Sequence, residues 1–277
     1  GYLDEHGTKL LGIKPETIKA IRNEQALRDT LENVGEPYVS AKVLPTDAEC
    51  VTFAGEIGFP VLISPAFTPD FSEPIRCENA DDILSGFGSC AERSLVNEVY
   101  VRKCVDDYKE VEFVAMRDSF GNCISVSSTE NIDSVGIHSG DSIVVIPAQT
   151  LTDGETVRLR RAARKIADYL NIEGSCNVRF AINSDGSEYM VLAVEPQLNR
   201  TTALVSKATG YPIAQVSAKI ALGYKLYEIK NDITGVTTAA NEPAIDYCAV
   251  KVPRWSFENF DAATRKRGGT MQATGEA

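Results

Sequence analysis

The spacing of hydrophobic positions predicts helices in the first part of the chain. Between residues 14 and 35, apolar side chains recur at helical intervals, with a proline near the start and Gly35 and Pro37 after the end. The periodic positions are Ile18, Ile21, Ala26, Leu27 and Leu31. A short strand, a helix over 47–57 and a strand over 60–63 are expected next, completing a small α/β unit near Ala66. Residues 68–92 have weak periodicity and predict a loop with one short helix at most.

From residue 99 onward the pattern changes to the shorter period that is typical of strands. It predicts strands over 99–104, 111–117, 123–128 and 142–146, with a hairpin turn at Phe120-Gly121-Asn122. A helix over 153–170 follows, and its arginine-rich part, 158–165, is amphipathic and typical of a surface or partner-binding face. Two strands, 177–182 and 189–194, and a final amphipathic helix over 212–223 complete the prediction. These elements indicate an α+β architecture in two lobes.

Composition excludes several classes of function. The 277 residues carry a formal net charge of −11, which argues against non-specific binding to nucleic acid or to an anionic membrane. No run of about 18 apolar residues exists, so membrane insertion is not expected. An acidic balance does not exclude a local basic pocket for phosphates.

The cysteines and histidines limit the chemistry further. Seven cysteines without a C-x-x-C pair indicate scattered reduced thiols, which fit the cytoplasm or a mitochondrial matrix. Two histidines, His6 and His138, exclude a histidine-rich metal site and leave little choice of base for a nucleophilic triad. The first residue is a glycine and the last three are Gly-Glu-Ala, so we expect a piece of something longer.

The most informative stretch runs from Ala193 to Pro212 and reads A-V-E-P-Q-L-N-R-T-T-A-L-V-S-K-A-T-G-Y-P. It resembles the metal-and-phosphate strand of carbamoyl-phosphate synthase large chains, whose pattern is E-x-N-x-R-x-S-R-[ST]-[ST]-A-L-x-S-K-A-T-G-[YF]-P. The half from Arg200 onward is intact. In the other half, Ala193 stands in the place of the metal-binding glutamate, Glu195 in that of the asparagine, and Gln197 in that of the arginine.

Four further motifs resemble the same family in the same order. Residues 130–142 are similar to its E-N-x-D-x-x-G-x-H-[TS]-G-D-S run, and 147–152 to its P-A-Q-T-L-[ST]. Residues 242–247 and 251–255 are similar to E-P-[ST]-[IL]-D-Y and K-I-P-R-[WF]. The P-A-Q-T form indicates the first, carboxyphosphate-forming half of the family's large chain.

The resemblance implies an ATP-grasp fold, in which ATP lies between two lobes and metal ions bridge its phosphates. It implies an N-terminal α/β segment over 1–66, a small lobe over 67–130 and a large lobe over 131–277. Phosphoryl transfer in such a site depends on positioning and charge stabilisation, with Mg²⁺ held by carboxylate and amide oxygens.

The resemblance also assigns candidate binding residues. Glu110 and Glu112 match acids near the ribose, and His138, with Gly136 beside it, matches a histidine near the nucleotide. Gln149 matches a metal-binding glutamine, and Arg200 matches a phosphate-side arginine. Glu195 is a weaker candidate metal ligand, because a shift of two residues would let Glu195-Pro196-Gln197 stand for E-x-N. No catalytic residue is assigned.

Other groups that ATP chemistry needs are replaced. After Pro65-Ala66-Phe67 the family has a glycine-rich stretch, whereas residues 68–74 read T-P-D-F-S-E-P and contain no glycine. Prolines remove backbone donors and carboxylates repel phosphate, so this segment is not expected to hold a triphosphate. Ser64 and Glu24 stand where arginines are expected, and Lys103 replaces an acid. The losses fall mainly on charged groups of the phosphate side.

Several retained residues also have purely structural interpretations. His138 can fill a hydrogen-bonded turn after Gly136, and Gln149 can cap a loop carbonyl. Arg200 can pair with Glu195, and Glu110 and Glu112 can lie on a solvated strand edge.

Three functions are therefore open. The first is a catalytically degenerate ATP-grasp domain, without a confidently predicted cofactor, that serves as a structural or interaction module among the domains or subunits of a larger assembly. The second is a divergent, active synthase component that uses ATP and Mg²⁺ and a glutaminase partner. The third is a regulatory domain that binds nucleotide without turnover.

Overall fold

The computed structural model describes all residues except 1, 9, 69–72, 260–266 and 270. The chain forms two compact units, each assembled from segments that are distant in sequence. Unit 1 comprises residues 1–38, 109–132 and 144–251, and unit 2 comprises 39–108, 133–143 and 252–277. These units do not coincide with the three consecutive segments expected from the sequence, because strand pairing joins residues far apart along the chain.

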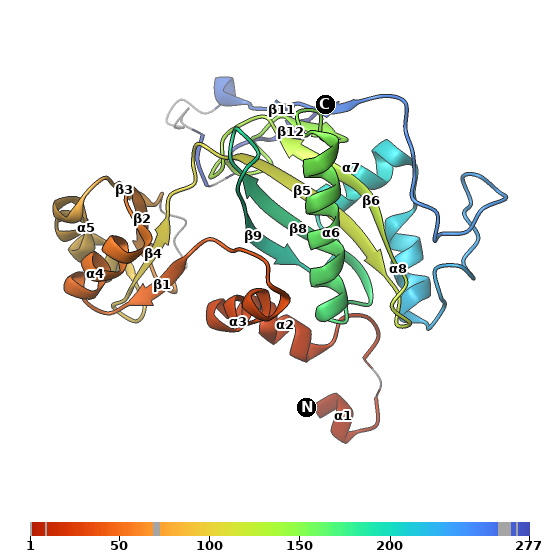
Figure 1. The fold of residues 1–277 in the computed structure, drawn as a ribbon, viewed down its shortest axis with the longest axis horizontal. Coiled ribbons are helices and arrows are strands. Elements are labelled where there is room, and N and C mark those ends of the chain that lie inside the picture. The colour runs from red at the N-terminus through yellow and green to blue at the C-terminus, as the bar shows by residue number, and fades with distance from the viewer. Residues whose placement is uncertain (1, 9, 69–72, 260–266, 270) are drawn as a thin grey trace. The chain divides into compact units, whose positions relative to one another are not determined.

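Unit 1 is built on a six-stranded antiparallel sheet of order β10-β7-β6-β5-β8-β9 (Figure 1). Its strands are β5 (Lys109–Arg117), β6 (Cys123–Asn131), β7 (Val144–Ile146), β8 (Gly174–Ile182), β9 (Tyr189–Glu195) and β10 (Ala249–Lys251). The central strand β5 is paired along its whole length with β8 and is buried almost throughout. The predicted α+β class is confirmed.

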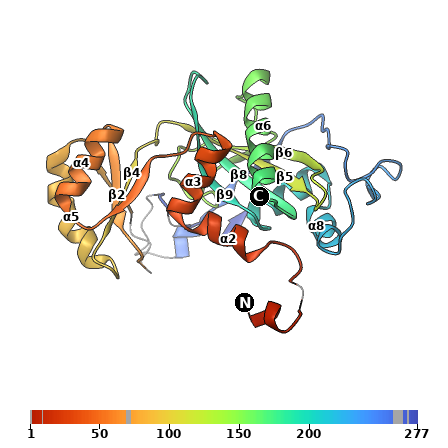
Figure 2. The same ribbon diagram turned by 60° about the horizontal axis from the view of Figure 1, so that its bottom comes forward.

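Helices cover both faces of this sheet (Figure 2). The helices of unit 1 are α1 (Tyr2–Glu5), α2 (Pro15–Arg22), α3 (Glu24–Val34), α6 (Asp153–Tyr169), α7 (Arg200–Thr209) and α8 (Ile213–Ala221). One core joins α6 and α3 to the face of β5 that carries Val111 and Phe113. A second core joins α7 and α8 to the opposite face, which carries Val114 and Met116. Residues on the two faces of β5 therefore belong to two separate environments.

Unit 2 contains a four-stranded antiparallel sheet of order β1-β4-β2-β3. Its elements are β1 (Ala41–Leu44), α4 (Asp47–Ile57), β2 (Val61–Pro65), β3 (Ile75–Cys77), α5 (Ala80–Arg93) and β4 (Val99–Lys103). A two-stranded ladder of β11 (Pro253–Arg254) and β12 (Gly275–Glu276) and a 3₁₀ turn, Phe257–Asn259, follow later in the chain. Helices α4 and α5 pack on the sheet through a core that includes Ile63, Ile83 and Val101.

Three predicted elements need correction. The helix expected over 14–35 is two helices, because Asn23 is extended and its side chain accepts a hydrogen bond from the Ala26 amide. The loop expected over 68–92 contains α5, of 14 residues. The stretch between the strand expected over 189–194 and the helix expected over 212–223 was given no element, and it contains α7, which Asn199 caps.

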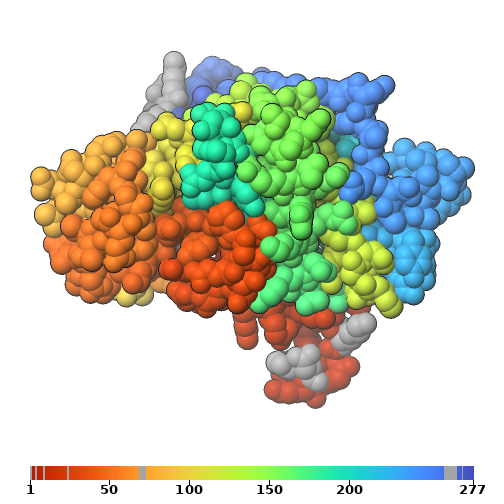
Figure 3. Space-filling model, in the orientation of Figure 1, coloured from red at the N-terminus to blue at the C-terminus, as the bar shows by residue number. Residues whose placement is uncertain are grey.

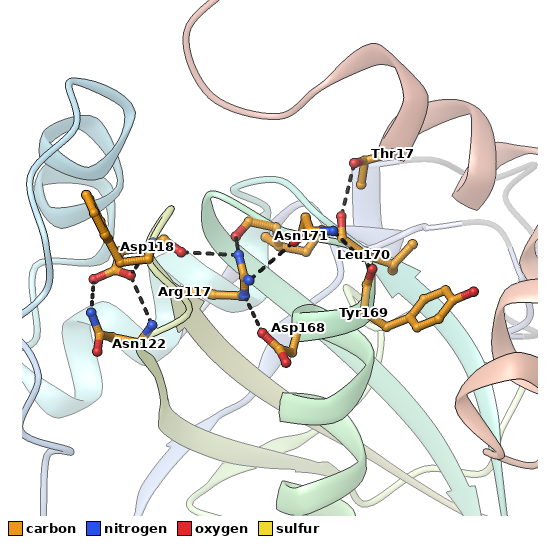
Figure 4. A network of polar contacts seen from close by, with 10 residues as sticks. Thr17, Arg117, Asp118, Asn122, Asp168, Tyr169, Leu170 and Asn171 are labelled. Carbon is orange, nitrogen blue, oxygen red and sulfur yellow. Dashed lines mark hydrogen bonds and ion pairs between the residues drawn. The ribbon is translucent and has the colours of Figure 1, made fainter.

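A polar network fixes the C-terminal end of α6 to the β5–β6 hairpin (Figure 4). Arg117 donates to the Asp168 carboxylate at 2.9 Å and to the carbonyls of Asp118 and Ile172 at 3.2 and 3.1 Å. Asp118 accepts hydrogen bonds from the amides of Phe120 and Asn122, which closes the predicted hairpin turn. The network therefore supplies donors to the carbonyls of Asp118 and Ile172 and joins the segment after α6 to the hairpin.

Thr17 extends this network to α2, and its substitution gives a first test of the fold. The Thr17 hydroxyl donates to the Leu170 carbonyl at 3.2 Å in a buried position (Figure 4). Thr17→Val should lower the free energy of unfolding by about 1 kcal/mol, because the carbonyl loses its donor while the side-chain shape is kept. Urea denaturation measures the change, with Thr8→Val at an exposed position as the control. Equal stability of both variants would mean that the hydrogen bond from Thr17 to the Leu170 carbonyl does not stabilise the fold.

No helix in the described part of the chain is both long and apolar enough to cross a membrane. All seven cysteines are free thiols. The predicted location in the cytoplasm or a mitochondrial matrix stays a prediction.

Candidate functional site

Two glutamates of β5 form the centre of the candidate site in unit 1. Glu110 and Glu112 are two residues apart and therefore point to the same face of the sheet. This is the face covered by α7 and α8. Their side chains are buried, with exposed fractions of 5% and 6%, so the interpretation as a solvated strand edge is wrong.

Arg179 of β8 lies among these carboxylates. It is directly opposite Glu112 in the β5–β8 register. Its Nη1 atom is 3.7 Å from Oε1 of Glu110, and its Nη2 atom is 3.3 Å from Oε1 of Glu195 at the end of β9. The guanidinium thus bridges acids from two strands that lie on either side of β8.

Amide and hydroxyl groups complete the cluster. Asn131 donates to Glu110 at 2.7 Å, Asn177 donates to Glu112, and Thr201 donates to the other oxygen of Glu112 at 3.0 Å. Asn199, which caps α7, donates to Glu195 at 2.7 Å. We call Glu110, Glu112, Arg179 and Glu195 the acid–arginine cluster.

Burial raises the pKa of both β5 glutamates. Desolvation is the largest cause for each, and it raises the pKa of Glu112 to about 7. Attraction to Arg179 acts in the opposite direction for both residues without cancelling desolvation. A carboxyl group that titrates near neutrality is therefore present in the cluster.

The cluster does not fit a divalent cation as it stands. Mg²⁺ needs several oxygen ligands around a common point, and here a guanidinium occupies the space that the carboxylates share. Within the described ranges, no group of three or more His, Cys, Asp or Glu side chains is arranged to hold a metal ion. Arg179 was missed in the sequence analysis. Its alternation with Asn177 along a strand was the available signal that both side chains face one side.

Gln149 lies away from the acid–arginine cluster. The backbone amides of Gln149 and Thr150 both donate to the Glu130 carboxylate. Glu130 is opposite Val111 in the β5–β6 register. Val111 faces the α6 core, so Gln149 is held near the face opposite Glu112 and Glu195. The structure does not bring Gln149 and Glu195 together as ligands of one ion.

The side chain of Gln149 has a structural partner. Its Nε2 atom donates to the Pro147 carbonyl at 2.8 Å, which confirms the interpretation as a cap on a loop carbonyl. Arg200 is the first residue of α7, directly after the cap Asn199, and is exposed. The nucleotide-binding roles assigned to these two residues stay predictions.

Gly136 and His138 belong to unit 2, whereas the acid–arginine cluster belongs to unit 1. Gly136 has a φ of +99°, a conformation that favours glycine. The His138 amide donates to the Gly268 carbonyl at 2.8 Å, and its Nδ1 atom accepts from the Gly140 amide at 3.0 Å. His138 therefore fills a hydrogen-bonded turn, as its structural interpretation expected.

The structure describes only part of residues 68–74, which the resemblance aligns with the family's glycine-rich stretch. Residues 69–72 and the Glu24 side chain lie outside the described residues. Ser64 is in β2, where it pairs with Tyr100 of β4, and Ala193 pairs with Arg179. The position where the family has a metal-binding glutamate therefore adjoins the guanidinium of the cluster.

The chain is similar to known proteins along its whole length. Residues 23–229 match the family model described as "Carbamoyl-phosphate synthase L chain, ATP binding domain". The carbamoyl phosphate synthase large chain of Agathobacter rectalis is 48% identical over 276 residues, and that of Clostridium perfringens strain 13 is 45% identical over 277 residues. The chain covers 26% of each of these relatives.

Solved structures show the same fold at low sequence identity. A complex of biotin carboxylase with β,γ-ATP from Campylobacter jejuni matches with a TM-score of 0.72 and 18% identity, covering 91% of this chain and 55% of that one. The biotin carboxylase domain of Hydrogenobacter thermophilus 2-oxoglutarate carboxylase matches with a TM-score of 0.73 and 15% identity, covering 91% of this chain and 54% of that one. These matches confirm the ATP-grasp fold. Together with the family model and the large-chain relatives, they show that the chain belongs to the carbamoyl-phosphate synthase large-chain family and has its ATP-grasp fold.

Proposed function

We propose that this chain is a catalytically degenerate ATP-grasp domain that serves as a structural or interaction module of a larger protein or assembly. The observation that carries the proposal is the bridge from Arg179 to Glu110 and Glu195, at 3.7 and 3.3 Å. A side chain of the protein itself supplies the positive charge that a metal ion would otherwise bring to these acids.

The neighbour of Arg179 supports the same conclusion. Ala193, which pairs with Arg179, brings no carboxylate to the position that matches the family's metal-binding glutamate. An acid is thus missing at the position that pairs with Arg179. Removing a single charge-stabilising group from a phosphoryl-transfer site costs on the order of 100- to 1000-fold in rate, so a combined change should abolish turnover.

Isothermal titration of the 277-residue chain with Mg-ATP tests the proposal. We expect no heat of binding at millimolar nucleotide, because the acids that would hold the metal ion are already paired. A micromolar dissociation constant would contradict the proposal. Titration with magnesium alone and with ATP in EDTA serves as the control for heats of dilution.

Manganese binding tests the role of Arg179 directly. The double variant Arg179→Gln/Ala193→Glu removes the guanidinium and adds a carboxylate, and we expect it to bind Mn²⁺ as measured by electron paramagnetic resonance. The unmodified chain and Ala193→Glu alone should not bind, because both keep the guanidinium. Equal Mn²⁺ binding by all three proteins would show that Arg179 does not block the site.

Two alternatives keep nucleotide binding. One is a divergent, active synthase component, and the other is a regulatory domain that binds nucleotide without turnover. Both alternatives are favoured by the presence of Glu110 and Glu112, the acids that match the family's motif, and by the pKa near neutrality at Glu112. Activity would use ATP and Mg²⁺ and ammonia from a glutaminase partner. Bicarbonate-dependent release of ADP from the full-length protein would decide for the active component, and bound nucleotide without turnover would decide for the regulatory domain.

A further inference from the structure

A basic pocket lies on the outer face of α6 in unit 1. The cations that line it are Arg158, Arg161 and Lys165, which follow one another on successive turns of the helix. Glu36 and Tyr189 form the opposite wall, and Val157 and Ala162 provide apolar surface. In Figure 3, α6 forms part of the face turned to the viewer, beside the β8–β9 hairpin. We call this feature the α6 pocket.

Two of the three cations form no ion pair with a described residue. Arg158 is held by the neutral carbonyls of Gly186 and Ser187 and lies 4.9 Å from the centre of the Tyr189 ring. Arg161 is exposed and has no ion pair within the described ranges.

The remaining charges near the pocket are accounted for. Lys165 forms an ion pair of 3.2 Å with Glu36, which also accepts a hydrogen bond of 2.6 Å from the Tyr189 hydroxyl. Glu155, one turn before Arg158, accepts hydrogen bonds from Thr152 in the capping box of α6, and it also attracts Arg158, so it offsets one of the cations. The pocket therefore retains a net positive charge, although the chain as a whole carries −11.

The arginines of α6 are not all alike: those in the α6 pocket form no ion pair with a described residue, whereas another arginine of the same helix does. Arg160, on another side of α6, is neutralised by Glu242 at 3.2 Å. The orientation of Arg158 is fixed by two hydrogen bonds and a ring contact, whereas a solvated surface arginine needs none of these. A pre-oriented guanidinium loses less conformational entropy when it binds a carboxylate.

The spacing of the cations identifies the kind of partner. Intervals of three and four residues place their helical positions ~4.5 and ~6 Å apart along the axis of α6. Acidic side chains at the same intervals on a second helix have the same spacing. Val157, which is 55% exposed, offers apolar contact between the charges. A small anion would use neither the spacing nor the apolar wall.

We propose that the α6 pocket docks an acidic helix of a protein partner. The helix presents carboxylates at positions i, i+3 and i+7 to Arg158, Arg161 and Lys165. Helix α6 packs on the face of the sheet opposite the acid–arginine cluster, so docking is independent of nucleotide binding. The two proposals can therefore fail separately.

Fluorescence anisotropy with a synthetic probe tests the docking proposal. The probe is a fluorescein-labelled, stapled alanine-rich helix with glutamates at i, i+3 and i+7, and the reference helix carries glutamines there. We expect saturable binding of the glutamate helix alone, and weaker binding at higher salt. Arg161→Glu should weaken binding by at least about tenfold, because it replaces an attraction by a repulsion. Lys42→Glu, at an exposed position of unit 2, makes the same change in net charge and should leave binding unchanged.

Each other outcome would overturn the proposal. Equal loss with Arg161→Glu and Lys42→Glu would show an effect of net charge rather than of the pocket. Equal binding of the glutamine helix would show that the carboxylates are not recognised. Full competition by inorganic phosphate at a concentration similar to that of the helix would show a small-anion site instead. Circular dichroism of both variants establishes that they are folded.

Discussion

Arg179→Gln is expected to lower the free energy of unfolding by about 3 to 5 kcal/mol at pH 8. The guanidinium bridges Glu110 and Glu195 and lies opposite Glu112. Its removal leaves two buried carboxylates and a third, partly exposed one close together without a compensating cation. Such a loss is a large fraction of the stability of a typical domain.

The loss should shrink as the pH falls. Without Arg179 the pKa values of the buried glutamates rise further above their unfolded values, so the native state binds protons more strongly than the unfolded state. Stability of the variant relative to the parent chain therefore increases from pH 8 towards pH 5. Urea denaturation at both pH values measures this dependence.

Arg179→Lys is the matched control for charge. It keeps a positive charge but loses the planar fork that reaches two acids at once, so we expect a smaller loss than with glutamine. A loss of less than about 1 kcal/mol for Arg179→Gln, independent of pH, would mean that solvent and not the guanidinium balances the acids. That result would also remove the main support for a degenerate site.

The architecture could be predicted from the sequence where hydrophobic periodicity was strong. The helix expected over 47–57 is α4 with the same bounds, and the strand and helix expected over 123–128 and 153–170 differ from β6 and α6 only at their ends. In α4 and α6 the buried positions recur at helical intervals, and Thr152 and Glu155 add a capping box to α6.

Helix α5 shows why weak periodicity misled the prediction. Its buried positions include Gly86, which has no apolar side chain to register in a pattern. A Cβ atom at Gly86 would lie 3.1 Å from Cδ1 of Ile63 and 3.3 Å from Cδ1 of Ile75. A larger residue would push both isoleucines by a few tenths of an ångström, so the glycine allows close packing of α5 on the sheet, and this constraint is tertiary. Local sequence favoured a loop because glycine and serine are poor helix formers.

For the candidate site, the sequence predicted which side chains of one strand share a face, but not which residues of neighbouring strands lie beside them. Alternation along β5 placed Glu110 and Glu112 on one face, and the structure confirms that arrangement. The neighbour of Glu112 is set by the register of β8, 67 residues further along the chain, which no local pattern reports. For the same reason Gln149 was grouped with Glu195 although the sheet separates them.

Glu112→Gln is expected to stabilise the protein at pH 8. The pKa of this buried carboxyl is raised from its ordinary 4.5 to about 7, so at pH 8 the native state holds an anion that the unfolded state accommodates more easily. The shift corresponds to about 3 kcal/mol at most. Glutamine keeps the length of the side chain and can accept from Asn177 while it donates to Thr201, whose hydroxyl can reverse its role.

The sign of the pH dependence separates this explanation from a general effect of substitution. Below pH 4.5 the glutamate is protonated in both states and the advantage of glutamine should vanish; between pH 4.5 and pH 7 it should grow, and above pH 7 it should be constant. Denaturant midpoints measured across this range against Glu56→Gln, an exposed position on α4, give the test. A constant difference would mean that attraction to Arg179 balances the effect of burial on Glu112, and a loss of stability that grows towards pH 8 would mean that the attraction is the stronger of the two. The cluster would then stabilise the fold as an ion-paired network, and its acids would remain charged and available to a competing cation at neutral pH.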